Sequence, residues 1–333
     1  YTPLYTLSLH DALPISPVEA GLLVRDFEPA SFLSESRANA LPPLFREPLS
    51  IEGRAALGAT VVDGAFSVKT EAGSALISLD RILLDWSRGD MLIENLRMAH
   101  AQSFGSELLL FVPEARVRVE SGSLFEPPAV VEYAVARGAD VRLIRGARGL
   151  FNLEGWMPDA APGPDAAPPP RAAAPAPVAI RRLELESGAF TYADYSDGRN
   201  PIILRLSGLG AIATNVILAD IPGGEVAGPG GLALHARLEQ RPHPDALFGL
   251  RARFGALGGG IPRADAEAVL AGLYVNALVG AARESIPDVF WGAPVTLECA
   301  AESAADSIGI SLRAGTGGGR EIADLERLDL ELD

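Results

Sequence analysis

The sequence predicts a mostly β protein: an elongated antiparallel sheet, rolled or groove-like, with one long helix near its C-terminal part. Apolar and polar residues alternate with a period of two from residue 49 onward, which predicts the strands. The 35 glycines and 26 prolines supply turns between many short strands. An apolar stretch with charged ends over 264–285 predicts the helix.

The alternation is clearest in the C-terminal half of the chain. Leu183 and Leu185 alternate with two glutamates, so one side of the predicted strand is apolar and the other is polar. The dipeptide Ser187-Gly188 then shifts the parity, and the apolar side continues at Phe190. A glycine at a parity shift indicates a β-bulge.

The N-terminal half shows the same period with less contrast between the two sides. Candidate strands there cover residues 91–98, 107–112, 115–120, 129–136 and 139–145, and a short helix is expected within 27–41. Val117–Phe125 is similar to Leu183–Thr191 and contains the same Ser-Gly pair, which indicates a weak internal repeat with a second bulge. Coincidence among many β-strands is the alternative.

The predicted helix runs from Ala264 to Ser285. Asp265 and Glu267 fall in its first turn and Arg283 in its last, which suits the helix dipole. Because the stretch between them is apolar on nearly every side, we expect a helix buried against the sheet. A plug or lid over an apolar groove is the alternative.

Composition divides the chain into four segments. Residues 1–16 include a run that resembles the translation of a sequencing adapter, so an artefact is predicted there and the native N-terminus is expected to be missing. Residues 158–178 are rich in proline and alanine and predict a solvated, semi-extended linker. This linker separates an N-terminal β-rich region, 17–157, from a C-terminal one, 179–333, which holds the helix at 264–285.

The acidic composition disfavours two classes of partner. Lys and Arg number 28 against 43 Asp and Glu, which gives a formal net charge of -15. Such a chain repels phosphate backbones, so nucleic acid is not an expected partner. Attachment to anionic lipid by bulk charge is disfavoured for the same reason.

Cys299 is the only cysteine, so an internal disulfide is impossible, and we expect it to be a small buried strand residue.

The sequence predicts no catalytic, cofactor-binding or metal-binding residue. No phosphate loop, nucleophile elbow or pair of histidines at metal-ligand spacing occurs in the sequence. Asp194–Gly198 is loosely similar to an acidic calcium loop but lacks the downstream glutamate, so a hairpin turn is the preferred interpretation. His235 is expected on the polar side of a strand, and His243 is expected in a turn.

Three stretches resemble the AsmA-like superfamily of bacterial envelope proteins, which includes the TamB-type proteins. They are Gly138–Leu153, which ends in a "G-x-x-N-L" turn from Gly149, the Pro/Ala-rich insertion after it, and Ile180–Asp194. The resemblance covers residues 44–215. It implies a periplasmic protein anchored in the inner membrane, with an apolar β groove, linked to outer-membrane assembly or to phospholipid movement between membranes.

The function expected from these observations is non-catalytic. The acyl chains of a phospholipid or another lipid would lie along apolar strand faces, screened from water, and other envelope proteins are expected partners. The closed β core of a structural or scaffolding envelope module is the alternative, and an envelope hydrolase is a third, weaker hypothesis. The candidate groove residues are Leu183, Leu185, Phe190, Ile202, Leu204, Leu232, Leu234, Phe248, Leu250 and Phe254.

Overall fold

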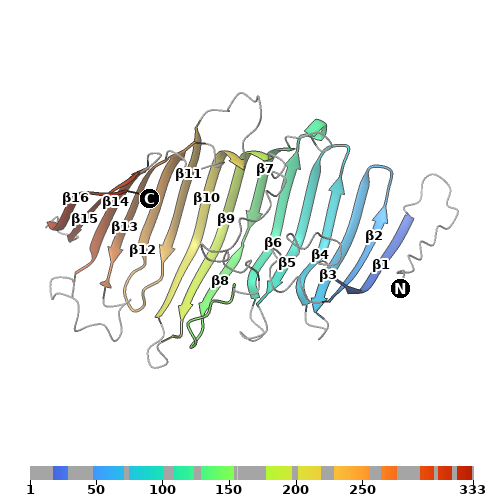
Figure 1. Cartoon of the computed structure of the whole chain (residues 1–333), viewed down its shortest axis with the longest axis horizontal. Coiled ribbons are helices and arrows are strands. Elements are labelled where there is room, and N and C mark those ends of the chain that lie inside the picture. The colour runs from blue at the N-terminus through green and yellow to red at the C-terminus, as the bar shows by residue number, and fades with distance from the viewer. Residues whose placement is uncertain are drawn as a thin grey trace, which may run out of the picture.

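The computed structural model shows a single 16-stranded β-sheet (Figure 1). It describes residues 18–28, 48–70, 75–100, 108–123, 129–153, 156, 178–196, 202–218, 229–255, 264–275, 293–303, 307–316 and 321–331. The strands are β1 (Val18–Phe27), β2 (Leu49–Leu57), β3 (Val61–Thr70), β4 (Ala75–Asp85), β5 (Asp90–Ala99), β6 (Leu108–Val119), β7 (Ala129–Arg137), β8 (Asp140–Arg145), β9 (Val178–Asp194), β10 (Ile202–Leu218), β11 (Gly230–Leu238), β12 (Ala246–Phe254), β13 (Ala264–Leu273), β14 (Val295–Ser303), β15 (Ser307–Thr316) and β16 (Glu321–Glu331). The mostly β prediction is therefore confirmed.

The strands follow one another across the sheet nearly in chain order. Every neighbouring pair is antiparallel except where β7 and β8, which lie end to end, pair with β9 in parallel. A parallel pair needs a crossover, which here connects the end of β8 at the lower edge of the sheet in Figure 1 with the start of β9 at the upper edge. The predicted Pro/Ala linker falls within this crossover, outside the described residues, and the sheet continues from the N-terminal to the C-terminal region.

The predicted helix at 264–285 is wrong over its first half. Ala264–Leu273 is β13, which pairs with β12 on one side and β14 on the other. Asp265 and Glu267 are alternating residues on one side of this strand, opposite Arg253 and Arg251 of β12. Alanine-rich composition favours a helix locally, but pairing on both sides of the strand overrides that preference. Residues 276–285 and the short helix expected within 27–41 lie outside the described residues.

A line of aligned bulges crosses the middle of the sheet. Strands β4 to β10 each carry one extra residue there, relative to β3 and β11, and the register between them stays matched. Four residues on this line have positive φ, namely Asn95, Gly138, Ser187 and Gly208. Glycine and asparagine adopt this conformation most readily. The bulge predicted at Ser187-Gly188 is therefore confirmed, as one member of the line.

The second predicted bulge is wrong. The equivalent Ser-Gly pair belongs to a 3-10 turn, η4 (Ser121–Ser123), that follows the end of β6. The strands predicted at 107–112 and 115–120 are one strand, β6, which passes through the bulge line at Pro113. A proline donates no hydrogen bond, so a bulge is one of the few places where a central strand accepts it.

Asn152 completes the hydrogen bonding of β8 at the lower edge. The ladder between β6 and β8 covers only Val141 and Asp140. Further along β8 the turn that follows it pairs on that side, through a bridge between Arg145 and Phe151 and through the Asn152 N–H, which donates to the Ile144 carbonyl oxygen at 2.9 Å. The Asn152 side chain, which has no exposed surface, completes this pairing. Its Oδ1 accepts the Ile144 N–H at 3.0 Å, and its Nδ2 donates to the Arg142 carbonyl oxygen at 2.6 Å. Nδ2 also lies 2.9 Å from Nδ1 of the buried His100.

Gln240 has the equivalent role in the C-terminal half. The pairing of β12 with β13 ends at Ala271, and the buried Gln240 amide satisfies the next backbone groups of the chain. Nε2 donates to the carbonyl oxygens of Gly272 (2.6 Å) and Pro244 (2.7 Å), and Oε1 accepts the Tyr274 N–H (2.9 Å). The adjoining core cluster consists of Leu238, Ala246 and Leu273.

Candidate functional site: the apolar face of the sheet

One face of the sheet is apolar from β1 to β16. Residues that pair directly in a sheet point to the same side, so the register identifies which side chains share a face. We follow the residue paired with Leu183 in each neighbouring strand, then the partner of that residue, until both ends of the sheet are reached. Every residue met in this way is apolar. The first row is Val18, Leu57, Val62, Leu84, Met91, Val117, Ala134, Leu183, Ala213, Leu232, Ala252, Ala266, Ala301, Ile310 and Leu328.

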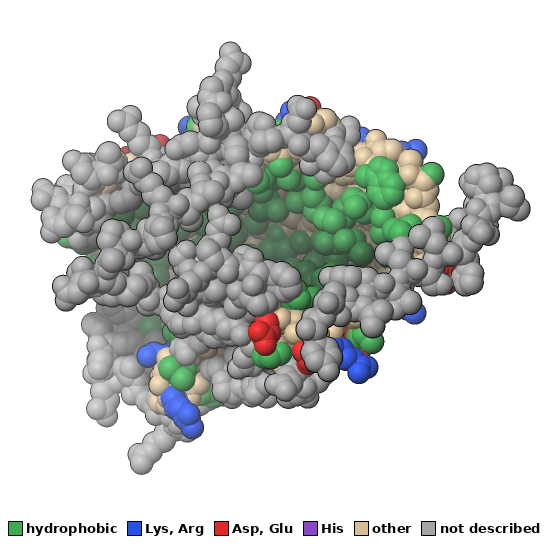
Figure 2. Space-filling view, turned by 45° about the vertical axis from the view of Figure 1, so that its right-hand side comes forward, with side chains coloured by type: hydrophobic (Ala, Val, Ile, Leu, Met, Phe, Trp, Pro, Cys, Tyr) green, Lys and Arg blue, Asp and Glu red, His purple; other side chains and the backbone are tan. Residues whose placement is uncertain are grey.

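A second row on the same face lies two residues further along each strand, or three in β16, where a bulge intervenes. It carries small and apolar residues only: Ala20, Ala55, Gly64, Ile82, Ile93, Ala115, Ala136, Leu185, Ala211, Leu234, Leu250, Ala268, Cys299, Leu312 and Leu325. We call the surface formed by these rows the apolar face. Figure 2 shows hydrophobic side chains gathered in a hollow of the molecular surface.

The bulge line keeps the apolar face continuous. Ile93 and Leu96 are three positions apart in β5, and without the bulge at Asn95 strict alternation would place them on opposite faces. Beyond the line a third apolar row follows in register. It comprises Val24, Ile51, Val68, Ile77, Met98, Leu110, Val141, Phe190, Leu206, Leu238 and Ala246.

All ten groove candidates proposed from the sequence lie on the apolar face. Leu183, Leu185, Leu232, Leu234 and Leu250 belong to its first two rows, and Phe190 belongs to the third. Ile202, Leu204, Phe248 and Phe254 share the face by alternation along β10 and β12. Their surroundings differ, because Leu183 is 43% and Ile202 46% exposed, whereas Leu204 packs against the core cluster.

The sequence-based list missed the N-terminal half of this face. Leu84, Met91 and Val117 continue the first row, and Ile82 and Ile93 continue the second. The period-two pattern in these strands was visible in the sequence. What the sequence could not show is that β7 and β9 are neighbours, which joins the two halves into one surface.

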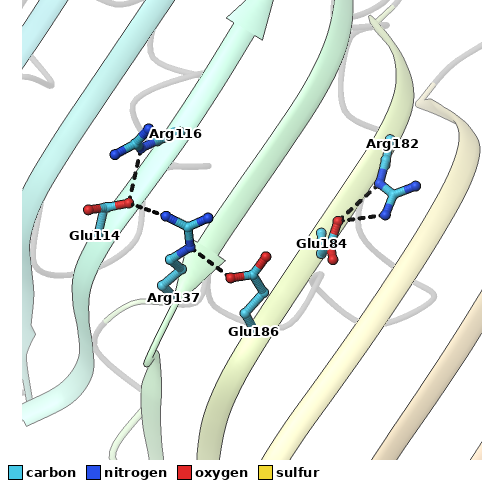
Figure 3. A network of polar contacts seen from close by, with 6 residues as sticks. All are labelled: Glu114, Arg116, Arg137, Arg182, Glu184 and Glu186. Carbon is cyan, nitrogen blue, oxygen red and sulfur yellow. Dashed lines mark hydrogen bonds and ion pairs between the residues drawn. The ribbon is translucent and has the colours of Figure 1, made fainter.

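The opposite face is polar and carries ion pairs between neighbouring strands. In Figure 3, Arg137 of β7 contacts Glu114 of β6 at 2.9 Å and Glu186 of β9 at 2.7 Å. Arg81 pairs with Asp63 at 2.7 Å, and its hydrogen bond lowers the pKa of the Asp63 carboxyl. Partly exposed pairs of this kind each stabilise a protein by about 0–1 kcal/mol. This face therefore carries the charged side chains of the sheet, together with exposed apolar residues such as Leu247 and Ile203.

The polar face also has a recess of about 680 Å³ over strands β10 to β14. Arg251, Arg253, Asp265, Glu267 and Glu302 are among the residues that line it. The arginines of β12 face the carboxylates of β13 across the recess, so charged groups line it, unlike the opposite face.

The other residues considered in the sequence analysis make contacts with neighbouring residues of the sheet and its turns. Asp194 accepts hydrogen bonds from Ser196 and Tyr192 and lies 3.3 Å from Arg145. The Ser196 hydrogen bonds, first of all, lower the pKa of the Asp194 carboxyl to about 2. His235 packs over Gly210 on the polar face, and His243 stacks on Tyr274 at 4.1 Å. Cys299 lies in the second apolar row and is half-buried.

The described residues contain neither a metal site nor a membrane-spanning helix. No group of three or more His, Cys, Asp or Glu side chains is placed to hold a metal ion in that part of the chain. Within the same residues, no helix has the length and hydrophobicity to span a bilayer.

Comparison of the chain with protein-family models, with curated proteins and with solved structures finds no match in any of the three. The geometry of the sheet is therefore the basis for a functional proposal.

Proposed function

We propose that this protein binds acyl lipids along the apolar face and handles them in the bacterial cell envelope. The observation that carries the proposal is the first row, in which every strand position from β1 to β16 presents an apolar side chain on the same side. Strands in a sheet lie roughly 4.8 Å apart, so this row is several times longer than one lipid tail, which occupies about half of a ~30 Å hydrocarbon core.

The chemistry of the face suits a lipid tail better than a polar ligand. The first two rows contain aliphatic residues, glycine, one methionine and one cysteine, and no group that would direct a hydrogen bond to a bound ligand. Binding would depend on removal of apolar area from water, at roughly 25 cal/mol per Å². This mechanism requires no catalytic residue and tolerates variation in the tail.

The resemblance to AsmA-like proteins supports the envelope setting. It implies a periplasmic location, an inner-membrane anchor, and a role in outer-membrane assembly or in phospholipid movement between membranes. These assignments are part of the proposal.

The test is native mass spectrometry of the purified full chain, followed by lipid extraction. Leu234 and Leu250 pair directly across β11 and β12, so changing both to Asp places two carboxylates on the apolar face. Leu247→Asp in β12 is the matched control, since Leu247 is 60% exposed and lies on the polar face. We expect phospholipid to co-purify with the wild type and with L247D, and to be lost from L234D/L250D.

Circular dichroism of all three proteins must show the same strand content for this comparison to count. A folded wild type that carries no lipid, even after incubation with phospholipid, would contradict the proposal. The scaffold alternative would then be preferred, and the core cluster around Leu238 already shows that part of the apolar face is closed by packing.

A further inference from the structure

Two turns at the upper edge expose large apolar side chains at the margin of the apolar face. The β2–β3 turn follows Leu57, which is 39% exposed, and the β4–β5 turn begins at Trp86, which is 40% exposed. We call Leu57, Trp86 and the turn residues 58–60 and 87–89 the Trp86 rim. Exposed aromatic and aliphatic side chains in one place indicate an interaction site with a protein or a membrane.

The structure of the turn holds Trp86 in a fixed position. The Asp85 Oδ1 accepts hydrogen bonds from the Ser87 N–H at 3.0 Å and from the Ser87 hydroxyl at 2.6 Å. Gly89 has φ of 69°, and a Cβ at this position would overlap the carbonyl oxygen of Val119. The backbone of the turn is therefore tied to β6, and the Trp86 side chain at its start is exposed.

The Trp86 rim continues into the apolar face. The Trp86 N–H donates to the Thr60 carbonyl oxygen at 3.1 Å, which extends the β3–β4 ladder by one residue. Alternation then places Trp86 on the same side as Leu84, and Leu84 and Leu57 are both members of the first row. An acyl chain that meets the rim has uninterrupted apolar contact from there onto the face.

The named charges beside the rim are two arginines and three carboxylates, so the rim has no excess of positive charge. Arg88 lies 3.7 Å from Asp85, and Arg118 lies 3.7 Å from Asp90 and 3.2 Å from Glu132. A surface without net positive charge has little electrostatic attraction for anionic lipid, and a total charge of -15 opposes it. Tryptophan, by contrast, favours the interface between headgroups and tails.

We propose that the Trp86 rim docks on a bilayer of zwitterionic lipid and is where acyl chains enter the apolar face. The docking itself stands on the exposed rim. The entry of acyl chains rests on the proposed lipid-binding function, so the two are tested separately.

The first experiment detects docking and does not depend on lipid binding by the face. The chain has three tryptophans, so W156F/W291F leaves Trp86 as the only tryptophan, and W86F/W291F leaves Trp156. Trp156 donates its indole N–H to the Ala99 carbonyl oxygen at the lower edge, which makes it the internal control. The probe is vesicles of phosphatidylcholine with brominated tails, which quench a tryptophan that reaches the acyl region.

We expect the vesicles to quench Trp86 and to leave Trp156 unchanged, and we expect less quenching when anionic phosphatidylglycerol is mixed in. Absence of Trp86 quenching would overturn the docking proposal whether or not lipid binds to the apolar face. Equal quenching of both tryptophans, or stronger quenching with anionic lipid, would overturn it as well.

The second experiment measures entry as the rate of lipid loading from phosphatidylcholine vesicles. The variant W86E should load about fivefold more slowly than the wild type, because an apolar contact at the membrane is lost. The amount of lipid bound at saturation should stay the same. Leu150→Glu, an exposed leucine at the lower edge, is the control and should load at the wild-type rate.

An unchanged rate in W86E, with normal saturation, would overturn the entry site and leave the proposed function intact. If the wild type binds no lipid at saturation, the proposed function fails and entry fails with it, whereas Trp86 quenching still decides the docking.

Discussion

Asn152 lies beside the end of β8, whereas Gln240 lies beside the end of β13 in the other half of the sheet. Each is a buried amide that satisfies backbone groups where the neighbouring strand stops short. They differ in their partners, because Asn152 also contacts the buried His100, while one partner of Gln240 is the carbonyl of the exposed Pro244. Backbone groups inside a protein must be paired, and one amide side chain supplies both a donor and an acceptor.

The largest effect is expected for Asn152→Leu. This change leaves the Ile144 N–H and the Arg142 carbonyl oxygen without their side-chain partner and removes a hydrogen bond to His100. Each buried group that loses its partner costs about 1–3 kcal/mol, so we expect unfolding to become easier by about 4 kcal/mol. Urea denaturation followed by circular dichroism measures this loss.

The aspartate variant provides the control for this substitution. Asn152→Asp keeps the acceptor for the Ile144 N–H but loses the donor, so its stability should fall between those of the wild type and the leucine variant. A leucine variant as stable as the wild type would mean that Asn152 does not complete the pairing of β8.

A smaller loss in the free energy of unfolding, about 3 kcal/mol, is expected for Gln240→Leu. The Gly272 carbonyl oxygen and the Tyr274 N–H lose their partner, but water can reach the Pro244 carbonyl in its exposed turn. The measurement is the same urea titration, with Gln240→Glu as the variant that retains the acceptor for Tyr274. If Q240L loses more unfolding free energy than N152L, then exposure of the backbone groups bound by each amide does not determine how much each amide stabilises the protein.

The sequence predicted different parts of these two regions. It singled out the Gly149–Leu153 turn through a family resemblance, but the role of Asn152 depends on where β6 begins relative to β8, which no local pattern records. Gln240 had no signal at all, because a lone glutamine beside a proline-rich turn is ordinary surface composition. The apolar side of β9 to β12 was predicted, since alternation is a local property.

The errors share a cause with these omissions. β13 was predicted as part of a helix because charged residues flank an apolar stretch, and its pairing with β12 and β14 makes it a strand. The Ser187-Gly188 bulge was predicted correctly and the one at 121–122 was not, although the dipeptides are identical. Ser187 is bracketed by partners in β7, β8 and β10, whereas residues 121–123 follow the last residue of β6.

The smallest effect expected is a pH dependence of the unfolding free energy, which arises from Asp194 near the Asn152 turn. Asp194 lies 3.3 Å from Arg145, next to the Asn152 turn, and its carboxyl has a folded-state pKa of about 2. The unfolded value is about 3.9, so the unfolded chain takes up this proton first as the pH falls. The stabilisation from Asp194 is therefore complete above about pH 4 and is lost as the pH falls towards 2.

Asp194→Asn removes this contribution, and a urea titration repeated from pH 5 to pH 2 measures it. The variant should be less stable than the wild type at pH 5, and the two should converge as the pH approaches 2. Residual acid sensitivity in the variant is expected, since arginine partners also lower the pKa of Asp63 and Asp80. A constant gap between the two proteins across this range would show that the Asp194 charge does not stabilise the turn, and that the Asn152 amide holds this corner of the sheet by itself.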